Sequence, residues 1–144
     1  MFSSFNISAS GMTAQRKRMD VISNNIANVD TTRTEEGGPY RRKMPVFQER
    51  GARPFSALLR DEIQYRQDSG VEISEIVEDR KPFKLVYNPE HPDANQDGYV
   101  EMPNVDITTE MVDMIDASRA YEANVTAMNT FKNMAMKALE IGRG

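Results

Sequence analysis

The side chains best suited to chemistry lie in a short polar loop near position 95. Residues 93–98 read Asp-Ala-Asn-Gln-Asp-Gly, which places oxygen ligands at alternate positions and a glycine where an EF-hand calcium loop turns sharply. Glu101 occupies the ninth position of such a loop, but the twelfth is Asn104 instead of a bidentate glutamate. Loop 93–104 has two interpretations. It is either an Asx-rich turn ended by glycine or the binding site of a calcium-responsive module, and the second interpretation would give the whole chain a calcium-dependent function. Chelator sensitivity would separate them.

The other reactive side chains form no recognisable catalytic set. The chain has no cysteine and a single histidine, His91, which excludes thiol chemistry and argues against a zinc site. Paired carboxylates such as Glu35 and Glu36 arise by chance in an acidic chain, and no glycine-rich phosphate loop is present. No pattern places a nucleophile beside a base. We therefore expect a protein that is not an enzyme and has no catalytic residue, cofactor or metal.

Composition narrows the class of protein further. With 144 residues the chain is long enough for one ordinary domain, and its net charge of -4 argues against a dedicated nucleic-acid binder. Mean hydropathy is -0.62 and no apolar run exceeds three residues, so we expect no direct membrane insertion. The first thirty residues contain no apolar stretch of the kind a secretory signal needs. If the protein leaves the cytoplasm, we expect it to do so without a cleavable Sec signal.

A long amphipathic helix is predicted within residues 1–30. Large apolar side chains recur there with the spacing of a heptad seam, and a second row has small side chains that would let another helix approach closely. The candidate interface residues of the seam are Ile7, Met12, Met19, Ile22, Ile26 and Val29, and the small-sided row comprises Ile7, Gly11, Ala14 and Val21.

Polar residues in and after this helix leave alternatives open. Asn25 and Asn28 either fix the register of a helix interface or mark a fraying helix end. The basic runs 16–18 and 41–43 are interpreted as solvated or pairing surfaces for acidic neighbours, in preference to a nucleic-acid or lipid patch.

A second, stronger helical pattern occupies residues 105–144. We predict one helix over 107–141, with Asp106 or Thr108 at its start and Gly142 just past its end. Its seam follows one a/d track that only Lys132 interrupts. The candidate interface residues on this track are Met111, Met114, Ser118, Tyr121, Val125, Met128, Ala135 and Leu139.

The middle of the chain, 31–104, has the pattern of strands and loops. Residues 40–48 alternate weakly and contain Pro45, which predicts an edge strand at best. Residues 49–70 receive no assignment.

A β-hairpin is predicted over about 71–87. Apolar residues at 71, 73, 76 and 77 predict a strand with one slip in register, and residues 83–87 alternate cleanly. The predicted fold class is therefore mainly α with a small β part. It has paired long N- and C-terminal helices, forming a coiled-coil-like inner layer, and a central β-hairpin and loop region.

Several stretches resemble one family. Residues 10–15 (Ser-Gly-Met-Thr-Ala-Gln) and 19–28 (Met-Asp-Val-Ile-Ser-Asn-Asn-Ile-Ala-Asn) resemble the N-terminal signature of bacterial flagellar rod, hook and hook-associated proteins. Residues 118–125 (Ser-Arg-Ala-Tyr-Glu-Ala-Asn-Val) resemble the matching C-terminal signature. Stretches within 31–42 and 98–105 narrow the resemblance to the basal-body rod members. The short middle segment resembles that of a proximal rod protein more than the longer middle segments of hook or distal rod proteins.

This resemblance implies a structural role. Members of the family are exported by the flagellar type III apparatus and assemble in the periplasm into the basal-body rod, the helical drive shaft that transmits motor torque. The implied partners are other copies of the chain, the rod proteins FlgB, FlgF and FlgG, the rod-to-MS-ring adaptor FliE and the export apparatus. The resemblance places residues 1–30 and 105–144 in the inner helical layer and 31–104 in an outer connecting region.

Overall fold

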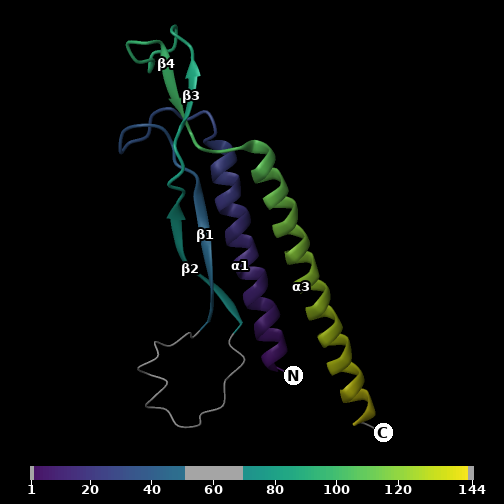
Figure 1. Cartoon of the computed structure of the whole chain (residues 1–144). Helices are drawn as coiled ribbons and strands as arrows, with labels where there is room; N and C mark the ends of the chain where they lie inside the picture. Colours follow the sequence, from purple (N-terminus) through teal and green to yellow (C-terminus); the bar gives the residue numbers. More distant parts are fainter. Residues whose placement is uncertain (1, 51–69, 143–144) are drawn as a thin grey trace, which may run out of the picture.

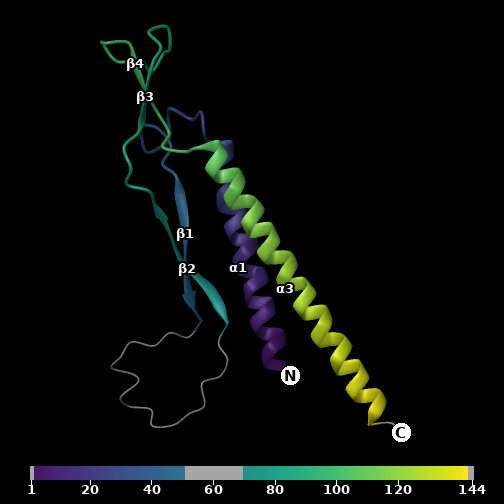
Figure 2. The same cartoon turned by 45° about the vertical axis from the view of Figure 1, so that its right-hand side comes forward.

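Two antiparallel helices form the long axis of the molecule (Figures 1 and 2). The computed structural model describes residues 2–50 and 70–142, so most of the unassigned interval 49–70 lies outside the described residues. Helix α1 runs from Phe2 to Ala27 and helix α3 from Ile107 to Ile141. They run in opposite directions, which brings both termini to the same end. The predicted helix over 107–141 is confirmed, and α1 begins earlier than its apolar seam indicated.

Local chemistry explains the sharp start of α3. The Asp106 carboxylate accepts a hydrogen bond from the Thr109 backbone N–H at 3.0 Å, as an N-cap residue does. This bond holds the pKa of the Asp106 carboxyl below its usual value. Gly142 follows the last turn, as the sequence predicted.

The small-sided row of α1 packs against α3. Ala14 and Val21 are buried in α1, and Ala117 is fully buried in α3. A Cβ placed on Gly11 would lie 2.8 Å from Oδ1 of Asn124 on α3. The absence of a side chain at position 11 therefore permits the close approach that the sequence predicted.

The β structure consists of two separate two-stranded antiparallel sheets. Strands β1 (Lys43–Glu49) and β2 (Val71–Glu78) form one sheet, and β3 (Lys84–Tyr87) and β4 (Tyr99–Met102) form the other. The β1–β2 sheet runs alongside α1 on the side away from α3 (Figures 1 and 2). The β3–β4 hairpin projects from the end of the molecule opposite to the termini.

The predicted hairpin over 71–87 is wrong in its pairing. Both segments are strands, but β2 pairs with β1, and β3 pairs with β4. The connection, Asp-Arg-Lys-Pro, has no glycine or asparagine for a tight hairpin turn. Asp79 instead turns the chain away, because its backbone N–H donates to Arg42 O at 2.8 Å and its Oδ1 accepts from Lys81 N at 3.0 Å.

The slip in register within β2 is confirmed. Pairing shifts between Val46 and Phe47 of β1, which leaves Ser74 as the extra residue of a β-bulge. Its hydroxyl donates to Val46 O at 3.2 Å. Pro45 lies in β1, which has one strand neighbour among the described residues and so is an edge strand as predicted.

The β1–β2 sheet is attached to α1 through Ser10. The Ser10 hydroxyl donates to Ile7 O at 2.7 Å and accepts from the Val71 backbone N–H at 3.0 Å. Gly70, just before Val71, has a φ of 68° and lies directly against Ser10. Of the helices in the described part of the chain, none is long and apolar enough to cross a membrane.

Replacing Gly70 by alanine should destabilise the fold more than replacing Gly37. Both glycines have positive φ, 68° and 89°, where a Cβ costs roughly 1–2 kcal/mol. A Cβ on Gly70 would also overlap the Ser10 side chain, whereas one on Gly37 meets nothing within 4 Å. Urea unfolding of the Gly70→Ala and Gly37→Ala chains measures the two losses of unfolding free energy. Equal losses would contradict the close packing of the β2 start on α1.

Candidate assembly interface

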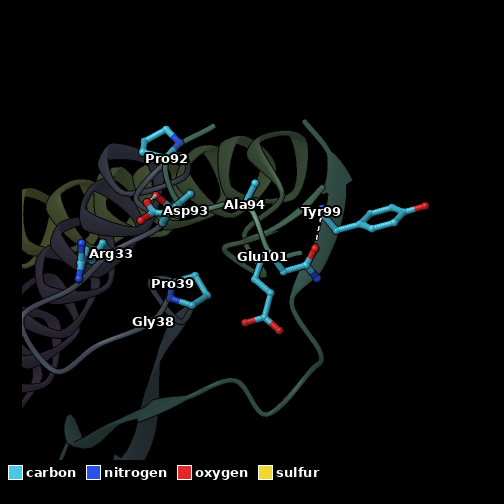
Figure 3. A pocket seen from close by; sticks show the side chains of 10 residues that line it. Arg33, Gly38, Pro39, Pro92, Asp93, Ala94, Tyr99 and Glu101 are labelled. Carbon is cyan, nitrogen blue, oxygen red and sulfur yellow. Dashed lines mark hydrogen bonds between the residues drawn. The ribbon is translucent and has the colours of Figure 1, made fainter. Parts of the chain in front are cut away.

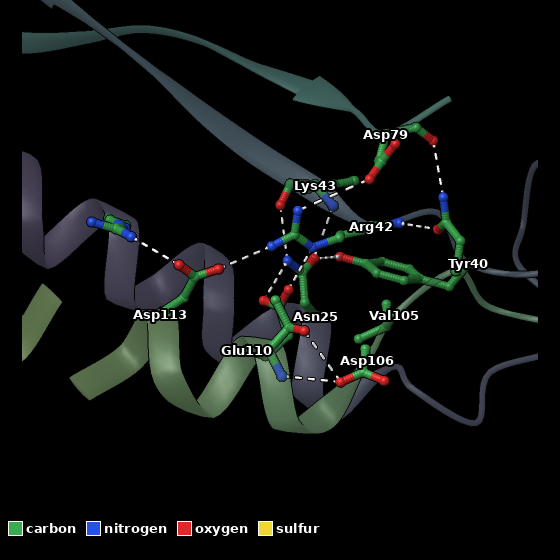
Figure 4. A network of polar contacts seen from close by, with 12 residues as sticks. Asn25, Tyr40, Arg42, Lys43, Asp79, Val105, Asp106, Glu110 and Asp113 are labelled. Atoms are coloured by element: carbon green, nitrogen blue, oxygen red, sulfur yellow. Dashed lines mark hydrogen bonds and ion pairs between the residues drawn. The ribbon is translucent and has the colours of Figure 1, made fainter. Parts of the chain in front are cut away.

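A buried polar cluster joins both helices to the residues just before β1 (Figure 4). Glu110, in the first turn of α3, is fully buried. Its Oε1 accepts from Arg42 Nε at 2.5 Å, and its Oε2 accepts from Asn25 Nδ2 at 2.9 Å. Burying a carboxylate is costly unless it is paired and hydrogen-bonded. The cluster therefore forms only when α1, α3 and the chain at position 42 occupy one relative arrangement.

Arg42 also pairs with two carboxylates that lie farther from the buried centre of this cluster. Its Nη2 lies 3.0 Å from Asp113 Oδ2, and its Nη1 lies 3.9 Å from Asp79 Oδ2. Asp113 Oδ1 also pairs with Arg18 of α1 at 3.0 Å. The interpretation of the two basic runs as pairing surfaces is thus confirmed for Arg18 and Arg42, whose acidic neighbours lie within the same chain.

Asn25 completes the cluster by binding backbone. Its Nδ2 donates to Lys43 O at 2.8 Å, and its Oδ1 accepts from Lys43 N at 2.9 Å and from the Tyr40 hydroxyl at 3.0 Å. The carboxamide thus pairs with Lys43 much as a neighbouring strand would. The register-fixing interpretation is confirmed for Asn25, which is 1% exposed. Asn28, past the end of α1, donates to Asn24 O at 2.9 Å instead.

Tyr40 is half-buried beside this cluster. Burial, and then the negative charges of Glu110 and Glu78, raise the pKa of the Tyr40 hydroxyl above its usual value. The hydroxyl therefore stays protonated and remains a donor to Asn25 into the alkaline range.

The predicted interface residues fall into different environments. On α1, Ile22 is buried, Met12, Met19 and Ile26 are half-buried, and Ile7 is 40% exposed; Val29 lies just past the end of this helix and is half-buried. On α3, Met114, Ser118, Tyr121, Val125, Met128 and Ala135 are half-buried, while Met111 and Leu139 are 55% and 71% exposed. Each seam is therefore partly buried in the subunit, and Ile7, Met111 and Leu139 remain exposed; their role as interface residues stays a prediction.

Sequence analysis missed the row that packs most deeply. Glu110 and Ala117 are fully buried, Asn124 meets Gly11, and the Phe131 ring lies 6.2 Å from that of Phe5. These α3 residues recur every seven positions, one position before the seam chosen from the largest apolar side chains. The heptad spacing of this row was the signal in the sequence that could have identified it as the partner of the small-sided row of α1.

Loop 93–104 has the geometry of an Asx turn. Asn95 Oδ1 accepts from Asp97 N at 3.0 Å and from Tyr99 N at 2.9 Å, and Gly98 has a φ of 81°. Asp93 accepts a hydrogen bond from the Thr32 hydroxyl at 2.7 Å. The turn interpretation is confirmed.

The same loop lines an open pocket with the 32–39 loop (Figure 3). Asp93, Asn95 and Glu101 share this pocket with Arg33 and Pro39. In the described residues, no group of three histidine, cysteine, aspartate or glutamate side chains is placed to hold a metal ion.

Comparison with known proteins agrees with this architecture. The family model described as "Flagella basal body rod protein" matches residues 5–33, and the one described as "Flagellar basal body rod FlgEFG protein C-terminal" matches residues 96–141. These segments contain most of α1 and all of β4 and α3. The class of protein is therefore a flagellar basal-body rod protein.

Individual relatives narrow the class to one family. The flagellar basal-body rod protein FlgC of Bacillus subtilis is 53% identical, with 99% of this chain and 98% of that protein covered. FlgC of Borreliella burgdorferi is 49% identical, covering 100% of this chain and 99% of that protein. FlgC of Salmonella typhimurium is 42% identical, covering 96% of each chain. The chain belongs to the FlgC family of flagellar basal-body rod proteins.

Replacing Glu110 by glutamine should lower the free energy of unfolding by about 3 kcal/mol, because Arg42 and Asn25 would lose a buried ionic partner. Asp113→Asn is the matched control. Its carboxylate also pairs with Arg42 but is 30% exposed, so about 1 kcal/mol or less is expected. Urea unfolding measures both. A Glu110→Gln loss no larger than the control's would contradict the central role of the buried pair.

The Tyr40 hydroxyl should make stability fall as the pH rises above about 10. Because its pKa is raised in the folded chain, the unfolded chain loses the proton first. The contribution is fully present below the unfolded pKa and is lost as the pH rises toward the folded one. Urea midpoints near pH 9 and near pH 11 should differ more for the native chain than for Tyr40→Phe. An identical alkaline loss in both chains would rule Tyr40 out as its source.

Proposed function

We propose that the chain is a structural subunit of the proximal part of the flagellar rod. It polymerises through its terminal helices into the helical drive shaft that transmits motor torque. Family membership supports the rod assignment. The observation that carries the assembly step is the outward face of α3, where Met111, Val112 and Ile115 are 55%, 54% and 52% exposed. Contiguous apolar side chains on a surface mark a site of protein contact.

Neighbouring subunits would cover this face together with the predicted seams. The charged side chains of Arg18 and Asp113 already pair within the subunit. The side chains of α3 that would contact neighbours are therefore the apolar ones, Met111, Val112 and Ile115. Contacts between unlike surfaces propagate into an open helical array, whereas two-fold contacts close after a dimer. In this proposal residues 1–30 and 105–144 form the inner helical layer, and 31–104 form the outer connecting region.

The remaining features of the proposal follow from the family resemblance. The partners are other copies of the chain, FlgB, FlgF, FlgG, FliE and the type III export apparatus. The rod segment lies in the periplasm, and the chain reaches it without a cleavable Sec signal. Its role is structural and not catalytic.

Cryo-EM of basal bodies extracted from membranes tests the proposal directly. We expect α1 and α3 to be traced side by side in the inner layer of the axial density. A compact density outside the axis, or none for this chain, would refute the proposal.

Replacing Met111 by aspartate should block assembly while leaving the subunit folded. Met111 is 55% exposed, so the charge is tolerated in the monomer but would be buried against a neighbour. We expect incorporation into basal bodies to fall about tenfold or more, with motility. Thr108→Asp, at an exposed polar position in the same part of α3, is the matched control and should assemble normally. Circular dichroism verifies that both variants fold. Normal motility of Met111→Asp would contradict the interface assignment.

A further inference from the structure

The β3–β4 hairpin is joined to the rest of the molecule by two linkers that are neither helix nor strand. Residues 79–83 lead from β2 into β3, and residues 103–106 lead from β4 into α3. The hairpin projects beyond them at the end opposite to the termini (Figures 1 and 2). A two-stranded hairpin has little stability of its own, and irregular linkers do not fix its direction. That direction must therefore come from side-chain contacts.

The Asn104 side chain bonds to two other stretches of chain at once. Its Oδ1 accepts from the Arg42 backbone N–H at 2.8 Å, just before β1. Its Nδ2 donates to Asp79 O at 3.0 Å and to Lys81 O at 3.2 Å, in the first linker. A carboxamide has one oxygen acceptor and one NH₂ donor group, and Asn104 uses both. It therefore ties the second linker to the first linker and to the start of β1.

Two basic side chains support the same junction. The Arg41 Nη1 donates to Asp79 O at 3.2 Å, and its guanidinium lies over the Phe83 ring, 4.3 Å from the ring centroid. Such a cation is attracted by the negative face of the ring. Lys84, the first residue of β3, donates from Nζ to Val105 O at 3.0 Å. Both linkers are thus held where the hairpin begins and ends.

A further contact holds the hairpin at a point away from its linkers. The Thr32 hydroxyl donates to Asp93 Oδ2 at 2.7 Å. Thr32 follows α1, and Asp93 belongs to the loop between β3 and β4. Both residues line the open pocket shown in Figure 3. A body attached at one point can rotate about it, whereas a second, separate attachment restricts that rotation.

We propose that Asn104 is a positioning residue that makes the β3–β4 hairpin a rigid arm, with the Thr32–Asp93 bond as its brace. Asp93 and Asn104 stand at the first and twelfth positions of the loop that resembles a calcium site in sequence, so this assigns both of them an anchoring role. The arm presents Leu85 and Tyr87, which are 64% and 65% exposed, at a fixed angle to the helices. The inference concerns the single subunit and does not rest on the proposed function.

Spin labels on engineered cysteines test the arm in the full-length chain, which has no cysteine of its own. Gln96→Cys in the hairpin loop and Ala123→Cys on α3 are exposed positions, and pulsed EPR measures the distance distribution between their labels. Asn104→Ala should widen this distribution at least about twofold, because three hydrogen bonds at the linkers are lost. An unchanged width would overturn the role of Asn104.

Asn24→Ala is the matched control, because this exposed asparagine donates only within its own helix, to Asp20 O at 2.9 Å. It should leave the width unchanged. A reference label pair at Ser23→Cys and Ala123→Cys spans α1 and α3, and should keep its narrow distribution in the Asn104→Ala chain. If the reference pair widens as much as the hairpin pair, Asn104 stabilises the whole fold and its positioning role is overturned.

Asn104→Asp separates the two sides of the junction. An aspartate keeps the acceptor for the Arg42 backbone N–H but cannot donate to Asp79 O or Lys81 O. We therefore expect it to widen the hairpin distribution about as much as Asn104→Ala does. A native width in the Asn104→Asp chain would overturn the proposed bridge between the linkers.

Thr32→Val tests the brace, because valine keeps the shape of threonine and lacks its hydroxyl. It should widen the hairpin distribution less than Asn104→Ala, since one hydrogen bond is lost instead of three. Thr32→Val combined with Asn104→Ala should give a wider distribution than Asn104→Ala alone. Equal widths in these last two chains would overturn the brace.

Discussion

The buried carboxylate of Glu110 is the constraint on which the rest of the structure depends. An unpaired charge at a fully buried position would cost several kcal/mol (roughly 3–5), so its partners must be in place whenever the chain is folded. Those partners, Asn25 and Arg42, come from α1 and from the chain entering β1. Replacing such a pair by apolar residues is often neutral for stability. We infer that its main effect here is to select one register among three elements.

The apolar core around this cluster is small for a chain of this length. Among the described residues, the buried hydrophobic side chains are Ala14, Val21, Ile22, Val100, Val105 and Ala117. Most of them are short, and many larger apolar side chains remain on the surface. Burial of apolar area is the main favourable term in folding. An isolated subunit therefore gains only part of the stabilisation that burying all of its apolar side chains would provide. Contacts between subunits would supply the remainder, as expected of a protein that functions in a polymer.

The helices could be predicted from the sequence because their pattern is long and local. Fourteen seam residues defined both helices, yet the deepest contact lies one position away, along Glu110, Ala117 and Asn124. Most of the large apolar residues chosen for the seams are half-buried, so side-chain size alone did not identify the row that packs most deeply. The β2 bulge was visible as a slip in alternation, whereas the pairing of β2 with β1 spans a long stretch of chain and depends on Asp79 and Arg42. No local pattern contains that information.

The two ends of the helix pair are built differently, and this difference has a mechanical consequence. Near the β3–β4 hairpin, Arg42 links the connecting region to α3 directly and to α1 through Asp113 and Arg18. Toward the termini, the helices lie farther apart in both views (Figures 1 and 2). The Phe5 and Phe131 rings meet there edge to face, with centroids 6.2 Å apart. A load applied to the connecting region would therefore reach both helices at a point of fixed geometry. At the widening end, Leu139 and Ile141 are 71% and 83% exposed, so in the proposed assembly these apolar side chains are available to a neighbouring subunit without any change in the geometry fixed around Arg42.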